Sequence, residues 1–535
     1  MQPRPHTTRT SRSHFAAILV AATLSVASAC PGPERNVLRV NDAAVGELDP
    51  HKASDYADSI LMYNLYDFLV RTAPDGSLVP DLATDWHAST DGLVYTFKLR
   101  SGVRFHDGSP LEAKDVAFSI HRMKSLNRGY AYLLPEIDNV EPLDALTVNI
   151  SLKKRFAPFL AALARVAIVN SEQIISNSED DDYGSTFLSS NDAGSGSYRV
   201  VSHNPRELTL MQRFDNHYQS FTPQAPELVR LKYSMAVPTV RALMARDQHE
   251  LTRISMPPEV LRALSETPGI ELVQDRGSTS FFIQLNTQRA PTDDLHFRRA
   301  IALAFDYDAL LRLLQVNDTL GNGLPTRGPL TPGLLGYDVT LPFPRRDLTA
   351  ARRELAQARY SPTEHTVEIQ WVSEVGNTER VALLFQQNMA ELGINVEVTR
   401  APWSLVLDRA TQSATTPHAN TVDVAAYTSD PDSILTAMFH SSSSGSWSAM
   451  SWLQDSAIDA RIEYGRELSD QDDRAQHYRK LNSDLIEIQP AIFGYQTATV
   501  VAKQSYVHAP QLDNPDEAVP TTSANYVFRK YALRR

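Results

Sequence analysis

The sequence predicts an α/β fold with more than one domain. The chain has 535 residues, 42% of them hydrophobic, which is enough to bury several cores. After the Asp91-Gly92 turn pair, residues 93–100 alternate apolar and polar side chains with the period of a half-buried strand. Residues 367–372, 378–392 and 394–398 follow as strand, helix and strand. Such a βαβ succession predicts parallel pairing and therefore an α/β architecture.

The N-terminal segment has the pattern of a secretory signal peptide. Three arginines and no acidic residue precede the apolar stretch 15–26, which ends at Ala27-Ser28-Ala29-Cys30. The stretch is too short for a comfortable transmembrane span. We therefore predict a signal peptide over residues 1–29 and an anchor linker over 30–35. The only cysteine, Cys30, stands where a bacterial lipobox carries its lipid, so we predict lipidation there; the alternative is ordinary cleavage near Ala29 with Cys30 incidental.

Two helices have sequence signals of their own. Ser109-Pro110-Leu111-Glu112 predicts a capping box with Ser109 at the N-cap and proline at the first helical position. The apolar side chains that follow share one helical face: Ala113, Val116, Ala117 and Ile120. Residues 296–314 predict a second, long helix with one apolar face.

Charge and motifs argue against several classes of function. The chain has 51 basic and 63 acidic residues, a net charge of −12, and no basic stripe, so we predict no nucleic-acid partner. No G-x-S-x-G, H-E-x-x-H or C-x-x-C motif occurs. His106-Asp107 is a turn rather than a metal pair, because no second His/Asp pair has ligand spacing. The sequence therefore predicts no catalytic residues, no metal and no cofactor.

One long block identifies a family. Residues 78–86 (LVPDLATDW) and the block that continues to residue 122 closely resemble the family 5 extracellular solute-binding proteins, which include the peptide-binding components of ABC importers. Other segments match that family in order: 48–51, 194–200, 297–306, 321–325 and Asp430-Pro431. The resemblance spans roughly residues 36–530.

The resemblance implies a type II periplasmic binding protein with two lobes, an additional subdomain and a ligand cleft between the lobes. Domain Ia would be discontinuous, with domain Ib and domain II inserted in it. The implied boundaries are 36–62, 188–276 and 491–535 for domain Ia, 63–187 for domain Ib and 277–490 for domain II. Chain crossings near Ser278 and Pro490 would form a hinge on which ligand closes the lobes.

The resemblance also implies ligand contacts. The residues after the Leu-Asp-Pro-His-Lys segment reach the ligand in the family, and an aromatic residue of the smaller subdomain contacts it. Trp403 resembles the family's tryptophan, with an arginine one turn on; the alternative for Trp403 is an indole that faces the core. The predicted ligand-binding residues are Ser54, Asp55, Tyr56, Tyr130, Tyr132, Trp403, Arg409, Tyr427 and Asp430.

The sequence departs from the family where peptide binders hold the ligand's ammonium group. In those proteins a Gly-Trp-x-x-Asp segment supplies the aspartate, in a strong charge-assisted pair. Here residues 422–431 read VDVAAYTSDP, without a tryptophan and without a clear counterpart to that aspartate. Asp430 either substitutes for it or caps a helix that starts near Pro431. Both interpretations stay open.

The expected function is that of a monomeric ABC-transporter binding protein. It would capture peptides and deliver them to an ABC permease in the inner membrane, from a periplasmic or cell-surface location and anchored through Cys30. The alternatives keep the role but change the ligand to a nickel chelate, an opine, an oligosaccharide or an antimicrobial peptide. An exported hydrolase is a further class, and it would need a nucleophile–base constellation that the sequence lacks.

Overall fold

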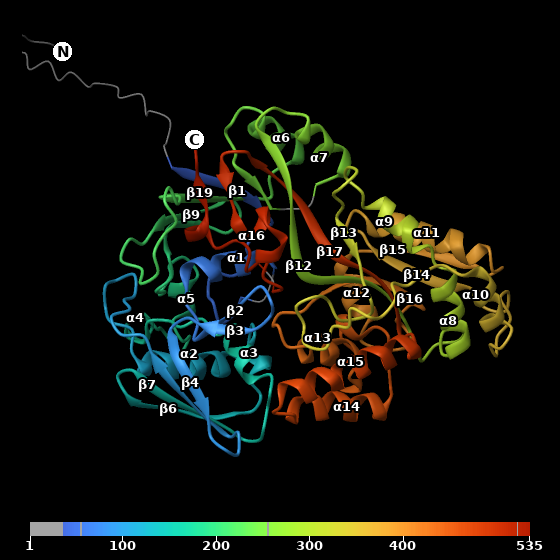
Figure 1. The fold of residues 1–535 in the computed structure, drawn as a ribbon, viewed down its shortest axis with the longest axis horizontal. Coiled ribbons are helices and arrows are strands. Elements are labelled where there is room, and N and C mark those ends of the chain that lie inside the picture. The colour runs from blue at the N-terminus through green and yellow to red at the C-terminus, as the bar shows by residue number, and fades with distance from the viewer. Residues whose placement is uncertain (1–35, 54–55, 254–255, 522) are drawn as a thin grey trace, which may run out of the picture. The chain divides into compact units, whose positions relative to one another are not determined.

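The computed structural model describes residues 36–53, 56–253, 256–521 and 523–535 (Figure 1). The predicted signal peptide, Cys30, Ser54 and Asp55 lie outside the described residues. Tyr56 begins helix α1 (Tyr56–Leu65), and its side chain is outside them too. Among the helices of the described ranges, none combines the length and apolarity needed to cross a bilayer.

A sheet of eleven strands forms the framework of the described chain. Its strands follow the order β15-β14-β16-β12-β17-β11-β1-β10-β9-β8, and β13 also pairs with β17. The bounds, in that order, are Val396–Ala401, Val367–Val372, Ala419–Ala425, Ile270–Leu285, Ala491–Gln504, Leu251–Thr252, Val37–Asp42, Leu228–Tyr233, Leu208–Arg213 and Tyr198–Asn204, with β13 at Gly323–Pro325. β14 and β15 are parallel, with Val367 beside Val396, which confirms the predicted βαβ unit.

Two long strands, β12 and β17, connect the two halves of this sheet. They pair antiparallel from Ile270 and Gln504 to Arg276 and Ala498, and the register then shifts before Ser280 meets Gln496. At the shift, Gln496 Nε2 donates to the Gly277 carbonyl at 2.9 Å. Figure 1 shows both strands running together between the two groups of elements. We call β1 and β8–β11 with their helices the first lobe, and β14–β16 with theirs the second lobe.

A small subdomain has its own antiparallel sheet, in the order β4-β5-β7-β6. The bounds are Ala83–Ala88, Val94–Leu99, Thr147–Leu152 and Ile137–Asp144. Helix α2 (Ala113–Leu126) covers the sheet, and a short hairpin of β2 (Val70–Thr72) and β3 (Leu78–Pro80) flanks it. Phe97, Val148 and Ile150 from the sheet and Val116 and Ile120 from α2 are fully buried together.

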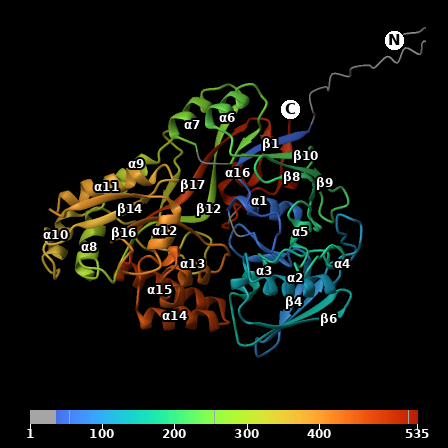
Figure 2. The ribbon, with the colours of Figure 1, turned by 180° about the vertical axis from the view of Figure 1, so that it is seen from behind.

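The remaining helices cover the sheets. Those of the first lobe besides α1 are α6 (Val237–Met244), α7 (Pro258–Ser265) and α16 (Pro510–Asp513). The small subdomain carries α3 (Phe159–Leu163), α4 (Ser171–Ser176) and α5 (Ser185–Leu188). The second lobe carries α8 (Leu295–Ala304), α9 (Tyr307–Leu313), α10 (Leu348–Leu355), α11 (Thr378–Ala390), α12 (Trp403–Arg409), α13 (Asp432–Phe439), α14 (Ser456–Glu467) and α15 (Gln471–Ile488). In Figure 2, as in Figure 1, α14 and α15 lie on the side of the second lobe that faces the small subdomain.

The predicted capping box at α2 is wrong by three residues, although its buried face is confirmed. Glu112, not Ser109, is the N-cap, and it exchanges reciprocal hydrogen bonds with Asp115, whose carboxylate accepts the Glu112 N–H at 2.9 Å. Ser109 belongs instead to the preceding turn, where its hydroxyl donates to Asp107 at 2.6 Å. Because that turn occupies the serine, the next acidic pair takes over the cap.

The predicted long helix over 296–314 is wrong as well, because the chain forms α8 and α9 with a break at Phe305. Asp306 caps α9 by accepting the Ala309 N–H at 2.8 Å, and its own N–H donates to Asn388 Oδ1 at 2.9 Å. Continuing the helix would cost both contacts, since an aspartate at the N-cap competes with helical backbone pairing.

The carboxylate of Asp423, on β16, has few hydrogen-bonding or charged partners. Within the described residues it accepts one hydrogen bond, from Thr497 Oγ1 at 3.3 Å, and pairs with no basic side chain. Burial raises the pKa of the Asp423 carboxyl to about 6. Folding therefore favours its protonated form, and its charge opposes folding at neutral pH.

We predict that Asp423→Asn stabilises the protein at pH 7 by up to about 3 kcal/mol, and that the gain vanishes near pH 4. The folded-state pKa is raised above the unfolded value, so the penalty removed by asparagine grows as pH rises from about 4 to 6 and stays above it. Urea unfolding of both proteins across this range measures the difference, with the exposed substitution Glu397→Gln as control. A difference that does not change with pH would contradict the assignment.

Candidate functional site

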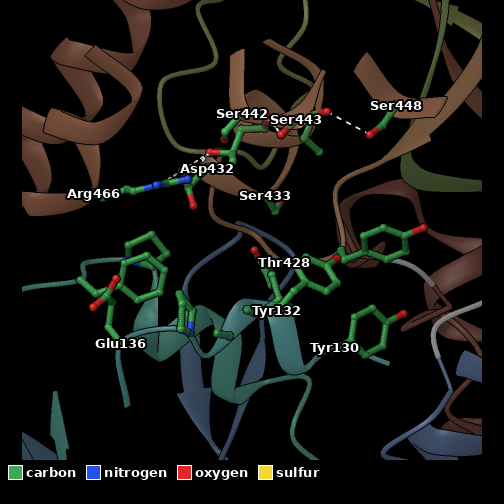
Figure 3. Close-up of a pocket in the computed structure, with 18 of the residues that line it drawn as sticks. Tyr130, Tyr132, Glu136, Thr428, Asp432, Ser433, Ser442, Ser443, Ser448 and Arg466 are labelled. Carbon is green, nitrogen blue, oxygen red and sulfur yellow. Dashed lines mark hydrogen bonds and ion pairs between the residues drawn. The ribbon is translucent and has the colours of Figure 1, made fainter. Parts of the chain in front are cut away.

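A cavity of about 850 Å³ lies between the small subdomain and the second lobe. The small subdomain contributes residues from 129–136 and 154–162, and the second lobe contributes residues from 424–437, 442–448 and 463–467. Figure 3 shows two walls that face each other, with Tyr130, Tyr132 and Glu136 on one side and Asp432 and the serines on the other. The volume is within the range of about 300–1,000 Å³ typical of small-molecule sites.

Tyrosine rings form one side of the cavity. Tyr130 is 5% exposed, and its ring centroid lies 5.4 Å from that of Tyr427 and 6.5 Å from that of Tyr132. Burial raises the pKa of the Tyr130 phenol, so the ring keeps a neutral hydroxyl. Tyr132, by contrast, is 57% exposed. Large apolar ring faces with a polar tip suit a ligand that has both apolar and polar parts.

Hydroxyl groups form the opposite side, and most of them have already donated their proton to the protein. Each of four serines donates to a main-chain carbonyl: Ser433 to Asp430, Ser443 to Thr436, Ser446 to Ser443 and Ser448 to Ala437, at 2.7–2.9 Å. A hydroxyl has one proton and two lone pairs. With the protons engaged, this wall offers ligands mainly hydrogen-bond acceptors, and so it favours a ligand rich in N–H or O–H groups.

Two ion pairs lie in the walls of the cavity. Arg466 Nε donates to Asp432 Oδ1 at 2.7 Å, and Thr436 bridges the pair by donating to Asp432 and accepting from Arg466, both at 2.6 Å. Burial raises the pKa of Asp432, while the Arg466 charge opposes that shift. On the other side, Lys154 lies 3.5 Å from Glu136. The other charged residues that line the cavity are exposed: Arg155, whose Nε donates to the Asp91 carbonyl at 2.9 Å, Glu463 and Glu467.

The two sides of the cavity also touch directly. The Ala157 N–H of the small subdomain donates to the Arg466 carbonyl at 2.7 Å, and the Arg165 guanidinium donates to the Tyr427 carbonyl. These contacts join segments more than 250 residues apart, and they bring the two walls of the cavity together in this structure.

A second contact between the small subdomain and the second lobe depends on glycine. Gly76, at the tip of the β2–β3 hairpin, lies against Gly333, and a Cβ at position 76 would come within 2.0 Å of the Gly333 oxygen. Gly333 in turn lies against Pro520, whose Cγ would be 2.5 Å from a Cβ at position 333. Gly333 belongs to a loop anchored in the second-lobe core through Leu330 and Leu334. The backbones approach this closely only because neither glycine has a side chain.

Residues 77–446 match the sequence model of the family described as "Bacterial extracellular solute-binding proteins, family 5 Middle". The chain belongs to this family. Family 5 proteins bind solutes outside the cytoplasm, and the fold of two lobes with a subdomain agrees with that of solved members.

Among curated relatives of this family 5 protein is the "Probable D,D-dipeptide-binding periplasmic protein DdpA" of Escherichia coli strain K12, 27% identical, over 94% of this chain and 97% of that one. The glutathione-binding protein GsiB of Pectobacterium atrosepticum is 31% identical over 66% of each chain. The solved periplasmic binding protein DppA from Helicobacter pylori, in complex with the peptide STSA, has a TM-score of 0.76 at 23% identity, with 93% of this chain and 98% of that one covered.

Three of the residues that the sequence predicted for ligand binding line the cavity: Tyr130, Tyr132 and Tyr427. Trp403 does not line it but packs behind the wall, with its ring 5.4 Å from that of Trp447, which does. Arg409 points to Glu368 and Gln370, at 3.2 and 3.3 Å, outside the lining.

Asp430 also lies outside the lining, and the rest of the protein occupies its carboxylate. Its two oxygens accept from Arg474 at 2.6 and 3.0 Å, and Oδ1 accepts the Asp432 N–H at the start of α13 at 2.9 Å. The last contact is of the helix-capping kind that one of the two sequence interpretations anticipated. Both side chains of the pair are buried, 3% exposed for Arg474 and 6% for Asp430.

Sequence reasoning missed most of the acceptor wall. The serines of residues 441–448, Thr436, Trp447 and the pair Asp432–Arg466 were not predicted. A signal was present, since four consecutive serines at 441–444 followed by Gly445 and Trp447 are unusual in a chain of ordinary composition.

We predict that Gly76→Ala shifts the protein toward wider separation of the lobes, because the new methyl group meets the Gly333 carbonyl. Small-angle X-ray scattering should show a larger radius of gyration than in the parent protein. Gly269→Ala is the matched control, because Gly269 has the same φ of +83° as Gly76 and open space around its Cβ position. Identical scattering from all three proteins would contradict the contact.

We predict that Asp430→Asn lowers the free energy of unfolding by roughly 3–5 kcal/mol, because the buried Arg474 loses its counter-charge. Chemical denaturation measures the loss. The double variant Asp430→Asn/Arg474→Met removes both charges and should recover part of the stability. A variant that keeps its stability but no longer binds ligand would instead support the ammonium-binding role.

Proposed function

We propose that this protein captures short peptides in the cavity and delivers them to an ABC permease of the inner membrane. The observation that carries the proposal is an open strand edge in the cavity wall. β14 pairs with β16 only at Ala419 and Asn420, and no other described strand pairs with that edge beyond Asn420. Val424 and Ala425, on the unpaired stretch, line the cavity.

An open strand edge suits a peptide because it offers backbone N–H and C=O groups in the spacing of an extended chain. Such pairing supplies affinity without reading side chains. The acceptor wall of serines faces the cavity as well, and a peptide carries an N–H at almost every residue. The tyrosine rings opposite offer apolar surface to side chains of different sizes.

Several relatives support a peptide ligand, although another, of Haemophilus influenzae, is named "Heme-binding protein A". Their names describe binding of D,D-dipeptides, of di- and tripeptides, and of glutathione, and the Helicobacter pylori structure contains the tetrapeptide STSA. We extend the peptide assignment to this chain on that basis, with Tyr130, Tyr132 and Tyr427 as ligand contacts. Ser54, Asp55 and Tyr56 stay proposed contacts through the family resemblance alone.

The proposal includes the location and partner. The N-terminal pattern and the family support a location outside the cytoplasm, and we propose that a lipid on Cys30 holds the protein at a membrane as a monomer. Binding would be without turnover, so a captured peptide should be recovered unchanged.

A non-peptide ligand is the second candidate. The same fold occurs in Campylobacter jejuni NikZ, solved with Ni(L-His), and in AgaA, solved with agropinic acid, at TM-scores of 0.75 and 0.73. The observation that favours it is the occupied Asp430, which leaves no free carboxylate at the position expected for an ammonium group.

A thermal-stability screen of a di- to pentapeptide library tests the proposal. A peptide at about 100 times its dissociation constant should stabilise the protein by roughly 2.7 kcal/mol, and mass spectrometry should recover it intact. Tyr132→Ala should weaken binding about tenfold, because it removes ring surface from the cavity. Stabilisation by a nickel chelate, opine or sugar but by no peptide would contradict the peptide assignment.

The control for that variant is Tyr464→Ala. Tyr464 is 55% exposed, like Tyr132, but lies outside the cavity lining. It should leave peptide affinity unchanged. An equal loss in both variants would show that the effect does not come from the cavity.

A further inference from the structure

Arg165 is a buried cation directly behind the cavity wall. It follows α3 in the small subdomain and is 5% exposed. Its guanidinium carbon lies 5.4 Å from the Tyr130 ring centroid and 5.5 Å from that of Tyr63, and its Nε donates to the Tyr427 carbonyl. Tyr130 and Tyr427 both line the cavity, as does Ala162, one helical turn before Arg165.

No carboxylate lies within ion-pair distance of this charge among the described residues. The buried Arg298 also has no ion pair, but its guanidinium donates to three main-chain carbonyls. Arg122 pairs with Asp49 at 2.6 Å, Arg474 pairs with Asp430 at 2.6 Å, and Arg253 pairs with Asp42. Arg165 has no ion pair, and its Nη2 is buried without a hydrogen-bond partner in the part of the chain that the structure describes.

An unpaired buried cation with an unmade hydrogen bond is costly, because both the charge and the donor have lost their water. The two tyrosine faces offset part of that cost through cation–π attraction. Within the described residues they leave the N–H groups of Nη2 unpaired. A carboxylate is the partner that suits these groups best, because a hydrogen bond from a guanidinium to a carboxylate is charge-assisted.

We propose that Arg165 binds a carboxylate of the captured ligand, such as the free C-terminus of a short peptide, where it enters between Tyr130 and Tyr427. This inference rests on the proposed function and deepens it. The ligand's carboxylate lies at the small-subdomain side of the cavity, and its N–H-rich part faces the serine wall. Recognition then begins from the carboxyl end, in keeping with the occupied carboxylate of Asp430.

A purely structural role is the competing explanation, because Arg165 also joins the two sides of the cavity through Tyr427. The two roles differ in one measurable ratio. A structural contact affects all ligands alike, whereas a carboxylate site distinguishes a peptide acid from the same peptide with a C-terminal amide.

The test uses the di- to pentapeptide library synthesised in matched C-terminal acid and amide forms. The full-length mature protein should bind the acid roughly ten- to a hundredfold more tightly than the amide. Arg165→Gln should bring this ratio close to one, and Arg165→Lys, which keeps the charge, should retain part of it. Arg312→Gln, at a side chain 69% exposed, is the control and should keep the full ratio.

The remaining outcomes separate the inference from the function on which it rests. Equal binding of acid and amide by the parent protein overturns the carboxylate role but leaves peptide capture intact. The same conclusion follows if Arg165→Gln weakens both forms equally, which is the structural outcome. If no peptide of either form binds the parent protein, both proposals fail. If Arg165→Gln does not fold, the ratio of acid to amide affinity in the parent protein and in Arg165→Lys still tests the carboxylate role.

Discussion

The antiparallel pairing of β12 with β17 is the constraint on which the rest of the structure depends. These strands are long enough to belong to both lobes, and their ladder is interrupted between Arg276 and Ser280. A continuous ladder would resist bending, whereas a register shift beside Gly277 leaves a short segment that can change its twist at low cost. The second-lobe wall of the cavity is attached to this pair, because β16 pairs with β12. The same pair therefore joins the lobes and contains the irregular segment at which they could move relative to each other.

The sequence predicted the regular elements well and the irregular ones poorly. β14, α11 and β15 were recognisable because their apolar periodicity is decided by burial, which a single chain records directly. The break at Phe305 and the cap at Glu112 depended instead on which of several polar side chains wins a local competition. The contact of Asp306 with Asn388 sets the break at Phe305, and the contact of Ser109 with Asp107 keeps Ser109 from capping α2. Neither contact produces a periodic pattern in the sequence.

The candidate site was predictable in part for the same reason. Tyr130, Tyr132 and Tyr427 could be named because aromatic residues in those segments match the family's pattern. The serines could not, because a serine run in sequence does not say where its protons go. Only the geometry shows that the hydroxyls of Ser433, Ser443 and Ser448 donate to carbonyls of their own wall. Direction of donation, rather than residue type, makes that wall an acceptor surface.

Most of the less exposed charged groups around the cavity are paired with an opposite charge, and Arg165 is the exception. Asp432 has Arg466, Glu136 has Lys154, and Asp430 has Arg474, so these three acids already have a cation within the protein. The other two acids of the lining, Glu463 and Glu467, are exposed. Arg165 alone among the buried arginines named here has aromatic faces instead of a carboxylate. A buried cation without a carboxylate partner, close to a cavity whose less exposed acids are paired, favours ligands with anionic groups. Binding free energy would then come from the hydrogen bonds between Arg165 and the ligand's carboxylate. Specificity would come from the desolvation cost of a buried donor that a ligand without a carboxylate leaves unpaired.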